Sequence, residues 1–478
     1  MNPVGAKAAF ALGAFALVIV ALFALERVGA PDRLVAALGP IAALIGVAGL
    51  GVLTRARTLL DFLSARRAVP PFYAGLAMAA VIGGFALAFA GADDDATRLP
   101  WRGIGAGIVL SALVFAPRWR AAQASAMADV FATRFPSLFA RVAFALILCA
   151  CGWGLATAGI GYAALSLRDS LGVGENAGLA LSAVALALSL APGGLRSLVW
   201  TDAASGAAGL LVIGLLVALS AQSGLDIQIE NVGAALGQWP AAPLVQEIAA
   251  AAATASLFAF VPPALAVASA AAARRAGLTA LVALGLGGAA AAALGDLAMK
   301  GPSDSALTAL IAWLPAMALA RAGLFAASRA VGLDLWRAPK RLSVLASRRM
   351  ALARGGVVIG AVVASFGARA AAHPSAPLFF ALALWLAFAA PSLLLAALPG
   401  RNSVPAIVAF SASVAAALAG RYVVFGNPTY GPDLLVGALG AGLAGLAAGL
   451  CVFALTPPAA PAPPLADPFV ELPVEALR

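Results

Sequence analysis

Few residues that could do chemistry lie inside the long apolar stretches of this chain, and Arg321 is the clearest of them. It lies within the apolar stretch 305–332, roughly a dozen residues or about 18 Å from the end of that helix. A guanidinium inside a membrane is costly unless it is paired or hydrated, so such a residue is a functional candidate by default. It could replace a bound cation or meet an anionic solute. The alternative is that it faces a watery vestibule or extends along its helix to the membrane surface.

Two pairs of helix-breaking residues also point to a binding site. Gly83-Gly84 lies in the middle of the stretch 71–91, and Pro262-Pro263 lies in the middle of the stretch 245–272. Proline removes a helical hydrogen bond, and paired glycines let the backbone unwind. The two stretches are five apart in chain order, and broken helices at matching positions of inverted repeats indicate a transporter's binding site near mid-membrane. The alternative is that the glycines only ease helix packing.

Enzymatic and metal chemistry find little support in the sequence. The single histidine is His373, and the cysteines Cys149, Cys151 and Cys451 all lie in apolar stretches, as expected of small buried hydrophobic residues. Without a cluster of histidines and cysteines or a nucleophile–base pair, we predict no enzyme, no structural metal and no cofactor. The net charge of +10 is explained by basic cytoplasmic loops rather than by nucleic-acid binding.

The composition identifies the solvent of this protein as lipid. Of its 478 residues, 63% are hydrophobic and 10% are charged, whereas soluble domains average about 25% charged residues. Backbone groups in lipid must be paired internally, and these stretches are too long and too continuous for barrel strands. We therefore predict an all-α polytopic membrane protein with the lipid bilayer as its first partner. The predicted helices are 7–25, 34–53, 71–91, 101–117, 139–166, 175–192, 204–222, 245–272, 277–298, 305–332, 353–373, 376–399, 403–424 and 432–456.

The distribution of basic residues predicts the orientation in the membrane. Alternate loops carry 17 lysines and arginines against eight in the other set, and the richer set is expected in the cytoplasm. Both termini then face the cytoplasm, and we expect a bacterial inner-membrane protein. The stretch 7–25 could be a signal peptide, but it is long for one and has no clear cleavage site, which favours an uncleaved helix. We predict one membrane domain over 1–456 and a proline-rich cytoplasmic tail over 457–478.

One stretch carries a recognisable motif. Residues 191–206, APGGLRSLVWTDAASG, resemble the sodium:solute symporter family, in which a glycine pair and a Trp-Thr-Asp triplet open a core helix. Weaker similarities lie at 61–80, 128–137 and 323–338, the last with Asp334 as the loop aspartate. The spacing looks most like that of the monocarboxylate, or acetate-permease-like, branch of the family. The matching motif residues are Gly193, Gly194, Trp200, Thr201 and Asp202.

The resemblance implies a fold and a function. The fold would be of the LeuT type, with inverted five-helix repeats at about 71–222 and 245–399. The function would be the transport of a small solute.

Read from their residue types alone, the motif residues have structural roles. The glycines make a tight turn, Trp200 sits in the interfacial aromatic belt, and Asp202 caps a helix near the membrane surface.

The sodium site that the resemblance implies lacks its side-chain oxygens. Family members use backbone carbonyls of the first core helix, here Ala79 and Ile82, and a Ser-Thr pair that falls on Ala318 and Leu319. Other polar positions of the family fall on Val81 and Val267. Ordinary sodium coupling is therefore not expected. Arg321 lies three residues after Ala318 and hence on the same helix face.

These observations predict a secondary transporter that moves a small organic solute, such as a monocarboxylate, by alternating access. The alternative is a symporter-like protein that no longer transports and serves as a sensor or binds a partner, such as a small membrane subunit.

Overall fold

The computed structural model describes residues 3–90, 99–121, 135, 137–222, 242–294, 306–331, 346–396, 404–423 and 432–455. Over these residues the chain is almost entirely helical and contains no strand, as predicted. Nine of the described helices are long and apolar enough to cross a membrane, and four shorter helices are also apolar. Each predicted apolar stretch overlaps a described helix, but the number of fourteen crossings stays a prediction. Asp334, the acidic run Asp93–Asp95 and the tail 457–478 lie outside the described residues.

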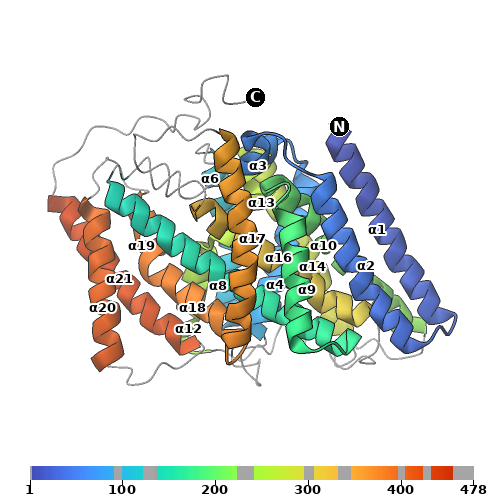
Figure 1. The fold of residues 1–478 in the computed structure, drawn as a ribbon. Coiled ribbons are helices and arrows are strands. Elements are labelled where there is room, and N and C mark those ends of the chain that lie inside the picture. The colour runs from blue at the N-terminus through green and yellow to red at the C-terminus, as the bar shows by residue number, and fades with distance from the viewer. Residues whose placement is uncertain are drawn as a thin grey trace.

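The helices follow the order expected of two flanked repeats (Figure 1). Two helices come first, α1 (Pro3–Arg27) and α2 (Asp32–Leu53), followed by a short helix α3 (Leu59–Ser64). The first five-helix unit consists of α4 (Pro71–Ala90), the run α5 (Trp101–Leu110), η3 (Ser111–Phe115) and α6 (Ala116–Ala121), then α8 (Leu138–Leu171), α9 (Glu175–Leu190) and α10 (Leu195–Gln222). The second consists of the run α12 (Leu244–Ala255), η4 (Phe258–Phe260) and α13 (Pro262–Leu265), then α14 (Ala270–Leu294), α16 (Ala306–Arg329), α17 (Ala346–Ala370), and the run α18 (Ala376–Leu384), η6 (Trp385–Ala389) and α19 (Ala390–Ala396). Helices α20 (Val404–Val423) and α21 (Pro432–Leu455) follow.

The two units pack on each other reciprocally. The first helix of each unit contacts the second helix of the other, α4 with α14 and α12 with α5, and the third helices α8 and α16 pack together. The α8–α16 contact depends on Gly152 and Gly323, where an added Cβ would lie 2.5 Å from the facing carbonyl oxygen. Small residues are what allow helix backbones to approach this closely within a membrane. This reciprocal pattern agrees with an inverted repeat.

The two predicted helix breaks have different outcomes. The run from α12 to α13 is interrupted at residues 256–261, and Pro262-Pro263 begins the short helix α13, so this break is confirmed. The prediction for Gly83-Gly84 is wrong, because α4 is one continuous helix from Pro71 to Ala90. Gly84 serves close packing instead. A Cβ on Gly84 would collide with the carbonyl oxygen of Pro315 on α16.

The basic loop at 54–70 contains structure that the sequence did not predict. Thr58 accepts a hydrogen bond from the Asp61 amide at 3.1 Å and so caps α3. The three residues that follow α3, 65–67, all have positive φ angles near 50°. These angles turn the chain sharply before α4 begins. Helix α3, helix α6 and the start of α1 lie at one end of the bundle in Figure 1. The described parts of two loops predicted to be cytoplasmic, α3 of the loop 54–70 and α6 at the start of the loop 118–138, therefore lie at the same end.

Candidate functional site

Arg321 lies deep within the helical bundle. Its helix, α16, packs against α4, α8 and α10, and the side chain of Arg321 is fully buried, with 0% of its surface exposed. The structure therefore contradicts the alternatives in which this arginine lines a watery vestibule or extends to the membrane surface. Arg329, which lies two turns further along α16, is also buried at 2% exposure.

The partner of Arg321 is Asp202 on α10. The Nε of Arg321 donates to Oδ1 of Asp202 at 2.5 Å, and its Nη2 donates to the hydroxyl of Ser205 at 2.9 Å. Asp202 and Ser205 are three residues apart and so lie on one face of α10. The expectation that Asp202 caps a helix near the membrane surface is wrong, because Asp202 is 0% exposed and forms this ion pair.

The pair retains unused hydrogen-bonding capacity. Oδ2 of Asp202 and Nη1 of Arg321 are buried and have no hydrogen-bond partner among the residues that the structure describes. Buried polar groups normally have a partner, and exceptions call for an explanation. One acceptor and one donor are therefore left for water or for a polar group of a solute.

The ion pair lies where three central helices meet. Gly206 of α10, next to Ser205, packs against the carbonyl of Leu76 on α4, and Gly84 of α4 packs against Pro315 and Leu319 of α16. The positions to which the resemblance assigns sodium ligands lie on these same helices. Ala79 and Ile82 are buried on α4, and Ala318 and Leu319 are buried on α16. Their side chains contain no oxygen, so only backbone carbonyls remain as ligands at these positions.

At the motif that opens α10, the predicted role of the glycine pair is confirmed and that of Trp200 is wrong. Gly194 has a φ of +56° in the turn between α9 and α10, which confirms the tight turn at Gly193-Gly194. Trp200 is not in an interfacial belt, since it is 4% exposed and its ring lies 4.9 Å from that of Tyr73. The Thr201 hydroxyl donates to the Ser197 carbonyl at 2.8 Å within the helix.

Aromatic side chains surround the interrupted run of the second unit. The rings of Phe85 on α4 and Phe260 on η4 meet edge to face at 5.5 Å, and Phe89 packs on Phe379 of α18 at 4.9 Å. The indole Nε1 of Trp385 donates to Ser256, its carbonyl and hydroxyl oxygens each at 3.1 Å, where the helix stops. Sequence reasoning missed this cluster, although the spacing of Phe85 and Phe89 places both on one face of α4.

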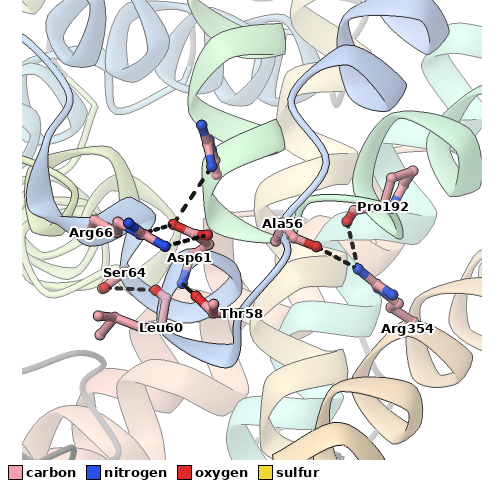
Figure 2. A network of polar contacts seen from close by, with 9 residues as sticks. Ala56, Thr58, Leu60, Asp61, Ser64, Arg66, Pro192 and Arg354 are labelled. Atoms are coloured by element: carbon pink, nitrogen blue, oxygen red, sulfur yellow. Dashed lines mark hydrogen bonds and ion pairs between the residues drawn. The ribbon is translucent and has the colours of Figure 1, made fainter. Parts of the chain in front are cut away.

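A second polar network lies at the end of the bundle that holds α3 (Figure 2). Asp61 of α3 is buried and pairs with Arg66 at 2.6 Å and with Arg196, at the start of α10, at 3.6 Å. Nη2 of Arg354, on α17, donates to the carbonyls of Ala56 at 2.9 Å and Pro192 at 3.0 Å. These contacts attach the segment before α4 to α10, α17 and the turn between α9 and α10.

Replacing Asp61 with asparagine should loosen this attachment. The carboxylate is the shared counter-charge of two arginines, and an amide cannot compensate for both. We expect a cysteine introduced at Ala79, in a background without native cysteines, to react at least several-fold faster with a membrane-impermeant thiol reagent applied from the α3 side. The same cysteine with Arg348→Gln, a change at an exposed residue of α17, should react at the unaltered rate. Equal reaction rates in the Asp61→Asn and Arg348→Gln variants would mean that the network does not restrict access to α4 from the α3 end of the bundle.

One comparison with known proteins finds a family whose model matches part of the chain. Residues 98–328 match the model of the sodium:solute symporter family. The resemblance to this family is confirmed. The symporter motif on α10 and Arg321 both lie within the matched residues.

Two solved structures that are similar to this chain are those of transporters. A sodium-coupled sialic acid symporter in a substrate-bound, outward-open state, described as revealing a novel sodium site, matches with a TM-score of 0.69 and 16% identity, covering 90% of this chain and 98% of its own. A nucleobase-cation-symport-1 family transporter, MHP1, in a closed conformation with bromovinylhydantoin bound, has a TM-score of 0.48 and 15% identity, covering 84% of this chain and 96% of its own. No curated protein matches the sequence.

The first structural match confirms the LeuT-type fold that the sequence predicted. At 16% identity, the match shows the fold alone. Together with the family match, it supports a multi-pass membrane protein of the transporter class. The monocarboxylate branch, the repeat boundaries and the ion-site roles stay predictions.

Proposed function

We propose that this protein is a secondary transporter of a small organic solute in which the guanidinium of Arg321 takes the place of the sodium ion. The observation that carries the proposal is the buried ion pair of Arg321 with Asp202, on the same face of α16 as the family's sodium position at Ala318. It is supported by the family match and by the missing side-chain oxygens at Ala318 and Leu319.

The charge of Arg321 equals that of the sodium ion that it would replace. A bound sodium ion contributes one positive charge between helices, and Arg321 contributes the same charge through a covalent tether, with Asp202 as its counter-ion. The guanidinium alone would repel a second cation about 4 Å away by roughly 4 kcal/mol at an effective dielectric constant of about 20, and the attraction of Asp202 would offset part of this repulsion. The protein would therefore neither need nor accept sodium at this position.

The solute site proposed here lies beside the break at residues 256–261, next to the aromatic cluster of Phe85, Phe260 and Phe379. Aromatic walls with a few polar groups suit a small, largely apolar solute. The similarity to the monocarboxylate branch makes a short carboxylate the first class to test. The proposed location is the bacterial inner membrane.

One observation favours the alternative function, a relative that senses or binds a partner without transporting. The ion pair joins α10 and α16 by a covalently tethered charge, which, unlike a sodium ion, cannot leave during a cycle. A protein fixed in one state would benefit from such a link. In that case a partner such as a small membrane subunit would carry the function.

Solute counterflow in proteoliposomes separates the two functions, because it needs neither an ion gradient nor knowledge of the coupling. Vesicles loaded with one candidate solute from a panel of short carboxylates and neutral analogues are diluted into the same labelled solute. We expect at least one solute to give transient accumulation above protein-free vesicles. Accumulation by no member of a broad panel, with folded protein in the vesicles, would favour the non-transporting relative.

A further inference from the structure

A large apolar cavity lies away from the ion pair, on the side of the bundle that carries α21. It has a volume of about 630 Å³, is open on one side, and is lined by the run from α5 to α6, by α12, by η6 and α19, and by α21. This volume falls in the usual range for ligand pockets, about 300–1,000 Å³. Apart from Arg118, Trp119 and Ser256, its lining side chains are aliphatic or aromatic hydrocarbon.

The helices around this cavity run in the same direction, so residue number measures depth. Gly103 and Gly107 of α5 pack on Glu247 and Ala251 of α12, in the same order along both helices. Likewise, Gly442 of α21 packs near Leu386, and Gly449 packs near Leu395. The lining therefore has one end at Ile248 and Leu439 and the other at Arg118, Leu394 and Leu446, with Ser256, Leu386 and Gly442 between them.

The two ends differ in chemistry. The first end is wholly apolar, whereas the second carries the exposed Arg118 and the indole of Trp119. Nε1 of Trp119 is buried and has no hydrogen-bond partner among the described residues. This polar end belongs to α6, which lies at the end of the bundle predicted to face the cytoplasm (Figure 1).

We propose that the cavity binds one acyl chain of an anionic phospholipid from the cytoplasmic leaflet. The apolar lining would take the hydrocarbon, Arg118 would pair with the phosphate, and the indole of Trp119 would donate to a headgroup or ester oxygen. Because Gly107 packs on Ala251, Ile248 is level with Ile104, and the lining from Ile248 to Arg118 spans about 21 Å along the helices, about two-thirds of the ~30 Å hydrocarbon core. This depth takes an extended chain whose headgroup lies at one membrane surface.

The cavity also touches the interrupted run of the second unit. Ser256, the residue that accepts the hydrogen bonds of Trp385, is part of its lining. The bound chain therefore lies against the helix break beside the proposed solute site, although the proposal holds whether or not the protein transports.

Photo-crosslinking of the full-length protein in detergent micelles tests the proposal. The probes are a phosphatidylglycerol, a phosphatidylcholine and a free fatty acid that carry the same diazirine-bearing chain, and the labelled peptides are mapped by mass spectrometry. We expect phosphatidylglycerol to label residues 386–394 and 439–446 several-fold more than either other probe. Arg118→Gln should remove this preference, and Ala252→Phe, which fills the cavity, should reduce labelling by every probe.

Two control variants match these changes. Arg348→Gln removes an exposed arginine of α17, and Val282→Phe adds bulk to an exposed position on α14; both should label like the unaltered protein. The proposal is overturned if phosphatidylcholine or the fatty acid labels as strongly as phosphatidylglycerol. It is equally overturned if Ala252→Phe leaves labelling unchanged, or if labelling is absent and cross-links show a second copy of this chain seated on the cavity.

Discussion

Asp202→Ala is expected to destabilise the folded protein more than any other single change at the site, by about 3–5 kcal/mol. The substitution leaves the guanidinium of Arg321 buried without its counter-charge, since the described contacts then reduce to the Ser205 hydroxyl. Ser205→Ala removes one neutral acceptor and should cost about 1–3 kcal/mol. The measurement is the thermal unfolding of purified protein in detergent, followed by tryptophan fluorescence.

A paired replacement serves as the control for this prediction. Asp202→Leu combined with Arg321→Met removes both charges and keeps the volume, so it should recover most of the stability lost in Asp202→Ala. If Asp202→Ala unfolds at the temperature of the unaltered protein, Arg321 is not held in the folded state by this carboxylate, and the ion pair is not part of the site.

The second large effect is expected on transport. Combining Asp202→Asn with Arg321→Gln keeps both side chains polar and removes both charges, so the variant should fold but lose the fixed cation. We expect solute counterflow to fall on the order of 100-fold, which corresponds to roughly 3 kcal/mol. Arg321→Lys should retain part of the activity, because it keeps the charge but loses the planar guanidinium that contacts Asp202 and Ser205 together.

Arg348→Gln is the matched control, because Arg348 is exposed on α17, unlike the buried Arg329. It should transport within about two-fold of the unaltered protein, as expected for an exposed charge. Full activity in the neutral Asn–Gln variant would show that the pair only holds α10 to α16, and a bound cation would then have no role in the cycle.

The fold was largely predictable from sequence because the signals were long and strong. Apolar stretches of spanning length and the order of the symporter motifs predicted the helices and the LeuT-type core. Short signals were less reliable. The Gly83-Gly84 pair predicts a helix break, yet glycine equally serves close helix packing. The structure shows close packing, since α4 is continuous and Gly84 lies against the carbonyl of Pro315. Helix α3 was missed because its six residues are too few to show periodicity.

The site was predictable only in part. Arg321 stood out because a charge inside an apolar stretch is rare. Asp202 was named from its motif but placed at the membrane surface, because nothing in the sequence shows which residue faces it. Its partner is 119 positions away, and helix ends predicted from hydropathy carry errors of a few residues. The aromatic cluster depends in the same way on contacts between helices that are distant in sequence.

The sodium dependence of transport tests the central claim most directly. Initial rates of solute uptake by the unaltered protein in proteoliposomes are compared with sodium or with choline as the only external monovalent cation. Because the guanidinium of Arg321 already occupies the place of the cation in this account, we expect equal rates in the two media. Uptake that is stimulated several-fold by sodium, and that saturates with sodium concentration, would contradict the account.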